Sequence, residues 1–250
     1  TSLYAAQIGG LNTTQINALS TDQISVLTAS QVKGLTSVQL ASLNTEALVA
    51  LTTFQVDSLV ATQLNALSSS QISALETADV SAIDVYQVAS LTTDFVAALT
   101  TTQVEALTAA QVGKLTTDQF AQLGTDDIKA LTTAQMAAVT ATQINSLDAA
   151  QIQAIETADL INLRVTQVSA LSTASINALT TTQTQALTTA QIARISNTQL
   201  SSLVTAQTDT TAVAALFTSA QVGTTASPSL LTATQLSGIS TTNIAALRTD

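Results

Sequence analysis

The 250-residue chain contains no cysteine, histidine or tryptophan, and a single proline, Pro228. Without cysteine no disulfide framework can form, and without cysteine and histidine no metal site can use thiolate or imidazole ligands. Acid–base catalysis and catalytic triads that depend on histidine are excluded for the same reason. Several classes of enzyme are therefore excluded before any motif is considered.

Charge is also scarce. Charged residues make up 9% of the chain, aromatic residues 2%, and the net charge is −10. The six cations lie far apart along the sequence: Lys33, Lys114, Lys129, Arg164, Arg194 and Arg248. Because cations this dispersed form no basic patch in the sequence, we expect no nucleic acid and no anionic membrane surface as a direct partner.

Apolar residues are plentiful but never continuous. They make up 46% of the chain, and no run approaches the roughly 18 apolar residues that a membrane-spanning helix needs. We therefore expect no membrane span. The sequence shows no signal peptide and starts with Thr1, so we expect a processed chain or a piece of a larger one. The lack of cysteine is compatible with an extracellular bacterial setting.

The abundant residues form an eight-residue repeat. Counting in steps of eight from Leu3 to Leu203 gives 26 apolar positions without an insertion or deletion. With this residue labelled a in an octad a to h, position e is Gln in 20 of the 26 octads, and position f is almost always Ile, Val or Leu. Position b is mostly Ser, Thr, Asn or Asp, and h mostly Ala or Ser. The consensus Leu-Thr-Thr-Ala-Gln-Ile-x-Ala is visible at residues 107–114 and 187–194.

This period predicts one short helix per octad. On a continuous α-helix the apolar stripe would drift about 80° per octad, and on a strand positions a and f would point to opposite faces. A hydroxyl at b followed three residues later by Gln at e is a capping box, and the apolar residues at a and f form a hydrophobic staple. We therefore predict helices of roughly seven residues, about two turns, from c to the next a, linked by b.

Helices this short are unstable alone and must stack on neighbours, which predicts an all-α solenoid in which several octads complete one superhelical turn. We expect residues 1–203 to form this regular solenoid, with 43–122 duplicated as 123–202. Residues 204–230 interrupt the repeat and contain Gly223 and Pro228. Octads resume over 231–250, as a C-terminal cap or a junction.

Carboxylates supply the only conceivable catalytic pairs, Asp126 with Asp127 and Glu76 with Asp79. We interpret them as acids that complement helix dipoles. Calcium-binding loops and glycine-rich phosphate loops are absent from the sequence. We expect no catalytic, cofactor-binding or metal-binding residue, and no cofactor. The Gln column is interpreted as a capping device. The Thr column leaves ice binding as a remote alternative, because regular hydroxyls can order water.

The octads resemble the Thr/Gln/Ala-rich repeat tracts of giant bacterial secreted surface proteins, of the adhesin-like, type I secreted kind, over residues 3–210. That resemblance implies an extracellular or cell-surface structural role. We expect a non-enzymatic rod, spacer, or filament or surface-layer subunit, with itself or other cell-surface components as partners. The alternative is an adhesin module, a solenoid that binds a protein or glycan.

Overall fold

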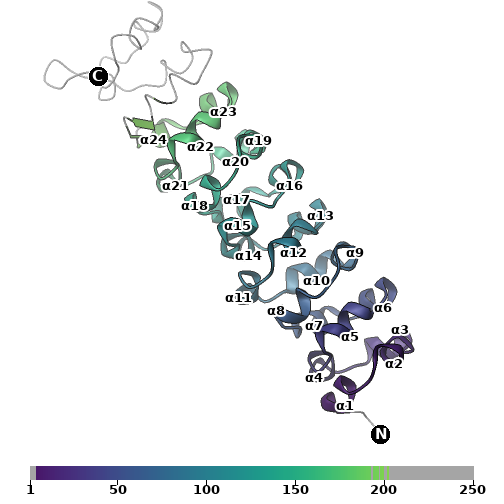
Figure 1. The fold of residues 1–250 in the computed structure, drawn as a ribbon. Coiled ribbons are helices and arrows are strands. Elements are labelled where there is room, and N and C mark those ends of the chain that lie inside the picture. The colour runs from purple at the N-terminus through teal and green to yellow at the C-terminus, as the bar shows by residue number, and fades with distance from the viewer. Residues whose placement is uncertain (1–3, 193, 197, 200–201, 203–250) are drawn as a thin grey trace, which may run out of the picture. The chain divides into compact units, whose positions relative to one another are not determined.

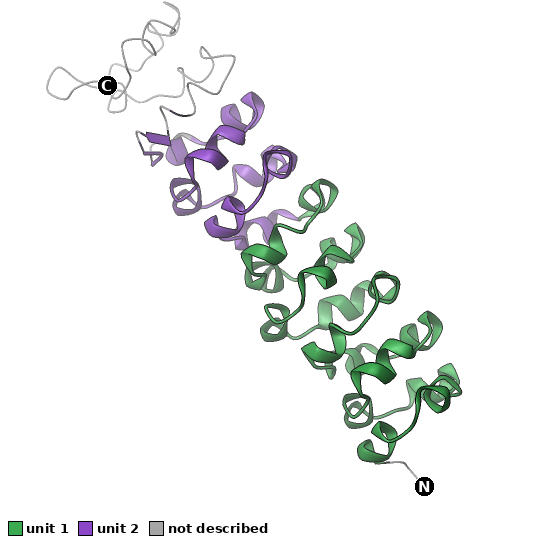
Figure 2. Ribbon diagram, viewed as in Figure 1, with its two compact units in different colours: residues 1–131 green, residues 132–250 purple. Residues whose placement is uncertain are grey.

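A computed structural model describes residues 4–192, 194–196, 198–199 and 202, and in this part of the chain it contains short α-helices and no strand (Figure 1). The chain separates into two compact units, residues 1–131 and 132–250 (Figure 2). The boundary falls inside the run of octads that we predicted as one solenoid. The predicted break at 204–230 and the resumed octads at 231–250 lie outside the described residues.

The first unit contains α1 (Ala5–Gly9), α2 (Thr13–Asn17), α3 (Thr21–Ser25), α4 (Ala29–Lys33), α5 (Ser37–Ser42), α6 (Thr45–Val49), α7 (Thr53–Asp57), α8 (Ala61–Leu64), α9 (Ser69–Ala74), α10 (Thr77–Ala82), α11 (Val85–Val88), α12 (Thr93–Ala97), α13 (Thr101–Ala106), α14 (Ala109–Lys114), α15 (Thr117–Phe120) and α16 (Thr125–Ala130). The second unit contains α17 (Thr133–Ala138), α18 (Ala141–Asn145), α19 (Ala149–Ala154), α20 (Thr157–Leu160), α21 (Val165–Ser169), α22 (Thr173–Ala178), α23 (Thr181–Ala186) and α24 (Thr189–Ile192).

The helices follow the octad, but they are shorter than predicted. Each begins at position c and ends at f, g or h, so its length is four to six residues rather than seven. Position a, which we expected to close the helix, leaves it: Leu43 has φ −61° and ψ 140°. Its N–H still bonds the carbonyl of Leu40 at 3.2 Å. Positions a and b therefore always belong to the link between successive helices, joined by h or by g and h where a helix ends earlier, so the chain has two to four residues in which to change direction.

The predicted capping box is present along the array. In the octad of α5, the N–H of Thr36 donates to Gln39 Oε1 at 2.7 Å, and the N–H of Gln39 donates to Thr36 Oγ1 at 3.2 Å. The same pair of hydrogen bonds caps α13 through Thr100 and Gln103. Two backbone donors that a short helix leaves unpaired are thus satisfied within the octad.

Each unit is a solenoid whose turn takes between three and four octads. In the first unit α1 packs on α4, and the same three-helix step recurs through α7, α10, α13 and α16. In the second unit α17 packs on α20 and α19 on α22, while α18 packs on α22, four helices on. Each junction therefore changes the chain direction by roughly a right angle or slightly more. The predicted all-α solenoid is confirmed in both units.

The core consists of positions f and a. From Ile8 to Ile192 every f residue is buried, and the a residues are buried from Leu35 to Ile195. Stacking therefore removes from water the apolar column that no single octad could bury. The polar exception at f is Thr184, whose fully buried Oγ1 has no hydrogen-bond partner.

The glutamines at e connect successive turns as well as capping their own helices. Gln103 Nε2 donates to the carbonyls of Ile72 and Leu75 at 2.8 and 2.7 Å, 31 and 28 residues earlier. The carbonyls belong to positions f and a of the preceding turn. We call this set of contacts the glutamine ladder; its donors in the two units include Gln39, Gln55, Gln63, Gln71, Gln87, Gln103, Gln111, Gln119, Gln167, Gln183, Gln191 and Gln199.

At two of the octads whose position e is not Gln, an asparagine from the preceding turn takes its place. Phe95 and Ser175 occupy e, and neither can accept the cap N–H as Gln does. The N–H of Thr92 instead donates to Asn65 Oδ1 at 2.8 Å, and that of Ser172 to Asn145 Oδ1 at 2.7 Å. Both asparagines lie at position g, 27 residues before the N–H that they accept. A side chain from the preceding turn thus completes the cap.

Replacing Gln103 by Glu should separate the two roles of the ladder. Glu keeps the acceptor for the N–H of Thr100 but places a carboxylate against the carbonyls of Ile72 and Leu75. We expect the free energy of unfolding to fall by about 2–4 kcal/mol, because the new carboxylate is buried and faces acceptors instead of donors. Urea unfolding and hydrogen exchange of the surrounding turns measure this loss. The matched control is Gln15→Glu, at an exposed e position, with an expected change within about 0.5 kcal/mol. Equal losses in the two variants would refute a role between turns.

The asparagine contact predicts a coupled pair of substitutions. Asn145→Ala removes the acceptor of the partly buried Ser172 N–H and should cost about 1 kcal/mol. In a Ser175→Gln background the new Gln can accept this N–H and occupy the space that Asn145 leaves, so the cost of Asn145→Ala should fall. A double-mutant cycle on the free energy of unfolding measures the coupling. Additive effects of the two substitutions would contradict this account.

Candidate functional site

The structure separates the first predicted acidic pair. Asp127, at position e of α16, accepts the Gly124 N–H at 2.9 Å through Oδ2 and the Thr101 hydroxyl at 2.8 Å through Oδ1. It therefore does the work of the consensus Gln in the cap. Asp126 is exposed at position d. Both carboxylate oxygens of Asp127 therefore accept hydrogen bonds from the protein's own donors.

The second pair is also divided between surface and interior. Glu76 is exposed before α10, whereas Asp79 is buried at position e. Burial raises the pKa of the Asp79 carboxyl; Glu76 raises this pKa further, while a hydrogen bond from Thr53 lowers it. Its Oδ2 atom has no hydrogen-bond partner. At this position Gln donates an N–H of its side chain to the preceding turn, and a carboxylate has no hydrogen to donate.

Asp159 repeats this arrangement in the second unit. It is buried at position e of its octad, and burial again raises the pKa of its carboxyl, against a hydrogen bond from Thr133. The exposed Glu156 adds to the rise, as Glu76 does for Asp79. Asp79 lies in the first turn of α10, where we expected an acid that complements the helix dipole, but its side chain is buried in the interior of the solenoid.

Asp79 should make stability depend on pH. Its pKa is raised in the folded chain, so its favourable contribution is complete below the unfolded pKa, about 3.9, and is lost as pH rises through the folded pKa. Asp79→Asn restores a donor and removes the charge, and should stabilise the chain at pH 7 by about 1–3 kcal/mol. Urea unfolding at pH 4 and pH 7 tests this, with the exposed Asp126→Asn as the control. An Asp79→Asn variant that keeps the wild-type pH dependence would overturn the assignment.

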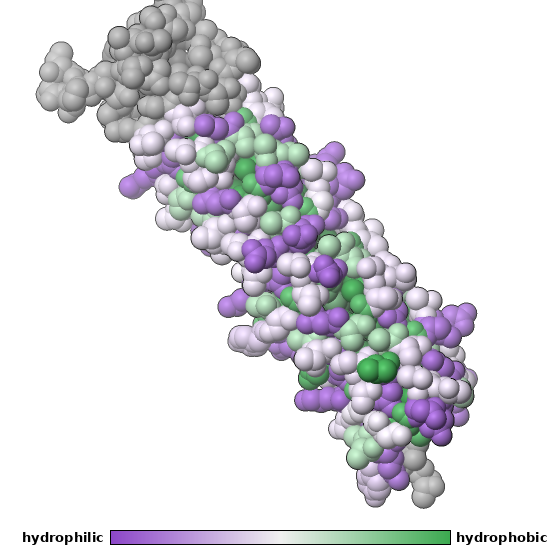
Figure 3. Space-filling model, viewed as in Figure 1, coloured by the Kyte–Doolittle hydropathy of each residue, from purple (hydrophilic) through white to green (hydrophobic). Residues whose placement is uncertain are grey.

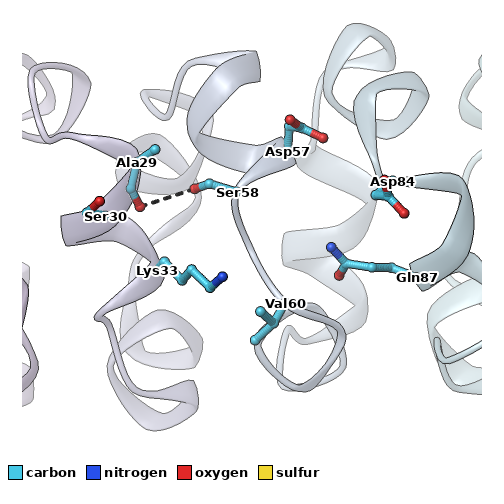
Figure 4. Close-up of a pocket in the computed structure, with 8 residues that line it drawn as sticks. All are labelled: Ala29, Ser30, Lys33, Asp57, Ser58, Val60, Asp84 and Gln87. Atoms are coloured by element: carbon cyan, nitrogen blue, oxygen red, sulfur yellow. Dashed lines mark hydrogen bonds between the residues drawn. The ribbon is translucent and has the colours of Figure 1, made fainter.

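The first unit also contains a shallow hollow of about 310 Å³ between α4, α7 and α11 (Figure 4). Its wall includes Lys33 and the carboxylates of Asp57 and Asp84. Asp84 bonds the Tyr86 N–H at 2.7 Å, and the buried Oε1 of the neighbouring Gln87 has no partner. Gln87 Nε2 donates to the carbonyl of Leu59 at 3.0 Å.

The duplicated block does not repeat the charges of this hollow. Eighty residues after Asp57 and Asp84 stand Ala137 and Arg164, so the charge of the wall changes sign. In that block the N–H of Arg164 donates to Gln167 Oε1 at 2.6 Å, so the contribution of Gln to the cap is present, whereas Arg164 supplies no side-chain acceptor. The charges that line this hollow are therefore particular to these octads and do not recur in the duplicated block.

The described residues contain no group of three or more carboxylates that could hold a metal ion. Carboxylates are the relevant side chains because the sequence has no histidine and no cysteine. None of the described helices combines the length and the apolar character required to cross a membrane.

The visible surface shows small apolar areas separated by polar ones (Figure 3). The notable polar side chains of this chain, the glutamines at e, are mostly turned inward.

The octad sequence also identifies the family of the chain. The ALTTAQ repeat matches residues 2–37, 72–109, 93–125, 120–154 and 152–189, which is more than half of the chain. The chain therefore belongs to the ALTTAQ repeat family. No curated protein matches it. Family membership agrees with the resemblance to Thr/Gln/Ala-rich repeat tracts at the level of a repeat protein.

Sequence reasoning missed the inter-turn role of the glutamines. The capping box accounts for one end of each amide, and the other end bonds carbonyls 28 and 31 residues away. One signal was available: the e column is adjacent to the buried f column, where an amide that bonds only within its own octad would leave its donor unpaired.

Proposed function

We propose that the chain is a non-enzymatic structural repeat protein: an extracellular rod, spacer, or filament or surface-layer subunit that associates with itself or with other cell-surface components. The observation that carries the proposal is the glutamine ladder. Its contacts, such as Gln55 to Ile24 and Leu27 or Gln183 to Ile152 and Ile155, join one turn to the next in the same way in both units. Such an interface extends by adding octads, so length is the property that the repeat controls.

The outer surface supports the same proposal. A recognition surface concentrates aromatic and charged side chains at a few adjacent positions. Here the exposed d positions are mostly small and polar, and the charges of the hollow beside Lys33 do not recur 80 residues later. Ice binding receives less support, because successive octads turn by about a right angle and their c residues do not follow one another on a flat face. An extracellular location rests on the resemblance to secreted surface proteins.

The adhesin alternative has one observation in its favour. Phe54 and Tyr86 stand at d positions with 72% and 80% of their surface exposed. Exposed aromatic rings are the side chains that commonly contact glycans and proteins. Their counterparts 80 residues later are Ala134 and Thr166. A binding role of this kind would therefore be confined to the first unit.

Electron microscopy and small-angle X-ray scattering of the purified full chain test the structural proposal. We expect elongated particles or fibres, because stacking turns extend in one direction. Compact monodisperse globules would refute it. Binding to a glycan array that is lost in Phe54→Ser and Tyr86→Ser variants, but kept when the exposed Thr62 is changed to Ser, would favour the adhesin alternative.

A further inference from the structure

The hollow between α4, α7 and α11 contains an exception within the glutamine ladder. Other donors of the ladder use Oε1 to accept the N–H at position b, as Gln103 does from Thr100 at 2.8 Å. Gln87 Nε2 bonds the carbonyl of Leu59 in the usual way, but its buried Oε1 has no hydrogen-bond partner among the described residues. A buried acceptor without a donor lowers stability, and exceptions of this kind occur mainly at functional sites.

The exception arises at the start of α11, where Asp84 occupies position b. Asp84 has φ −56° and ψ 131°, whereas Thr100, at position b of a regular octad, has φ −77° and ψ 157°. The Asp84 carboxylate accepts the N–H of Tyr86 at 2.7 Å, one residue before Gln87. The reciprocal pair of cap bonds is absent from α11, and the Gln87 side chain extends into the hollow (Figure 4).

Three charged side chains surround the same hollow. Lys33 comes from α4, Asp57 from α7 and Asp84 from the residue before α11, and all three are exposed. No ion pair joins Lys33 to either carboxylate within this part of the chain. Lys33 and Gln87 extend toward each other from opposite sides of the hollow (Figure 4). The wall therefore offers several acceptors and one charged donor that the protein itself leaves unused.

This set of groups fits a neutral sugar better than an ion. Each sugar hydroxyl can both donate and accept, so a single ring can donate to the carboxylates and accept from Lys33. A metal ion or an ammonium group would be repelled by Lys33, and an anion by the two carboxylates. The volume of about 310 Å³ lies at the lower end of the range for small-molecule pockets.

Exposed aromatic rings stand on the helices that supply the carboxylates. Phe54 lies in α7 three residues before Asp57, and residues at this spacing are neighbours on a helix surface. Tyr86 lies in α11 beside Gln87. Because 72% of Phe54 and 80% of Tyr86 are exposed, both rings are available to pack on the apolar face of a sugar.

We propose that this hollow binds a neutral saccharide unit, whose hydroxyls donate to the carboxylates and to Gln87 Oε1 and accept from Lys33. Oε1 is covered in this structure, so its use requires a rotation of the amide, in which this atom has no hydrogen bond to lose. The inference gives the adhesin alternative a site and a ligand class, and the structural role does not depend on it. Asp57 and Asp84 correspond to Ala137 and Arg164 in the duplicated block, which does not repeat the site.

Saturation-transfer NMR of the full chain with glucose, galactose, mannose and N-acetylglucosamine tests the proposal. We expect saturable binding of at least one of these sugars, and a shift of the Gln87 side-chain amide resonance when it binds. A variant with Lys33→Ala and Asp57→Ala should bind at least tenfold more weakly. Both positions are exposed, so folding should persist, as circular dichroism checks. The matched control, Asp126→Ala with Lys129→Ala, removes the same charges from exposed positions outside the hollow and should bind like wild type.

The alternatives give different results. Absence of binding by all four sugars would overturn the proposal, as would binding that is unchanged in the Lys33→Ala and Asp57→Ala variant. Binding of calcium chloride or of free lysine, but not of the sugars, would refute the ligand class. Electron microscopy of the same samples tests the structural function independently. Elongated particles without sugar binding would leave that function standing, whereas compact globules would refute it whether or not sugars bind.

Discussion

The fold depends on how one side chain satisfies backbone groups that short helices leave unpaired. A helix of four to six residues has more unpaired N–H and C=O groups than internal hydrogen bonds, and burying them unpaired would be costly. The Gln at position e bonds both kinds at once. For Gln39, Oε1 takes an N–H of its own octad, and Nε2 gives hydrogens to carbonyls of another turn. A single amide consequently contributes both to the cap of its own helix and to the stacking of one turn on another.

The local half of this arrangement could be predicted from sequence, because its partners stand three residues apart. The hydroxyl at Thr36 and the amide at Gln39 are visible as a pattern, as are the apolar columns at a and f. The other half joins residues 28 and 31 positions apart, and no local pattern records a distance set by the superhelical turn. The same limit applies to Asn145, whose role depends on Ser172 in the next turn.

The candidate chemistry was predictable only in part, for a related reason. Asp127 and Asp79 occupy the same octad position, yet Asp127 reaches the Gly124 N–H and Asp79 leaves an oxygen unpaired in the interior. Sequence spacing marks both as residues near a helix start. Burial by a neighbouring turn distinguishes them, and that burial is a property of the stack. The expectation of no catalytic or metal-binding residue stays a prediction.

The asparagine contacts have a consequence for how such a gene can change length. Where every octad carries Gln, removing or adding one octad leaves each amide facing an equivalent pair of carbonyls, so copy number can drift without loss of fold. Asn65 and Asn145 break this freedom, because each must stay 27 residues before the N–H that it accepts. Recombination inside those intervals would leave a cap without its partner. The two asparagines therefore fix the number of residues between particular octads, in a repeat whose octads are otherwise interchangeable.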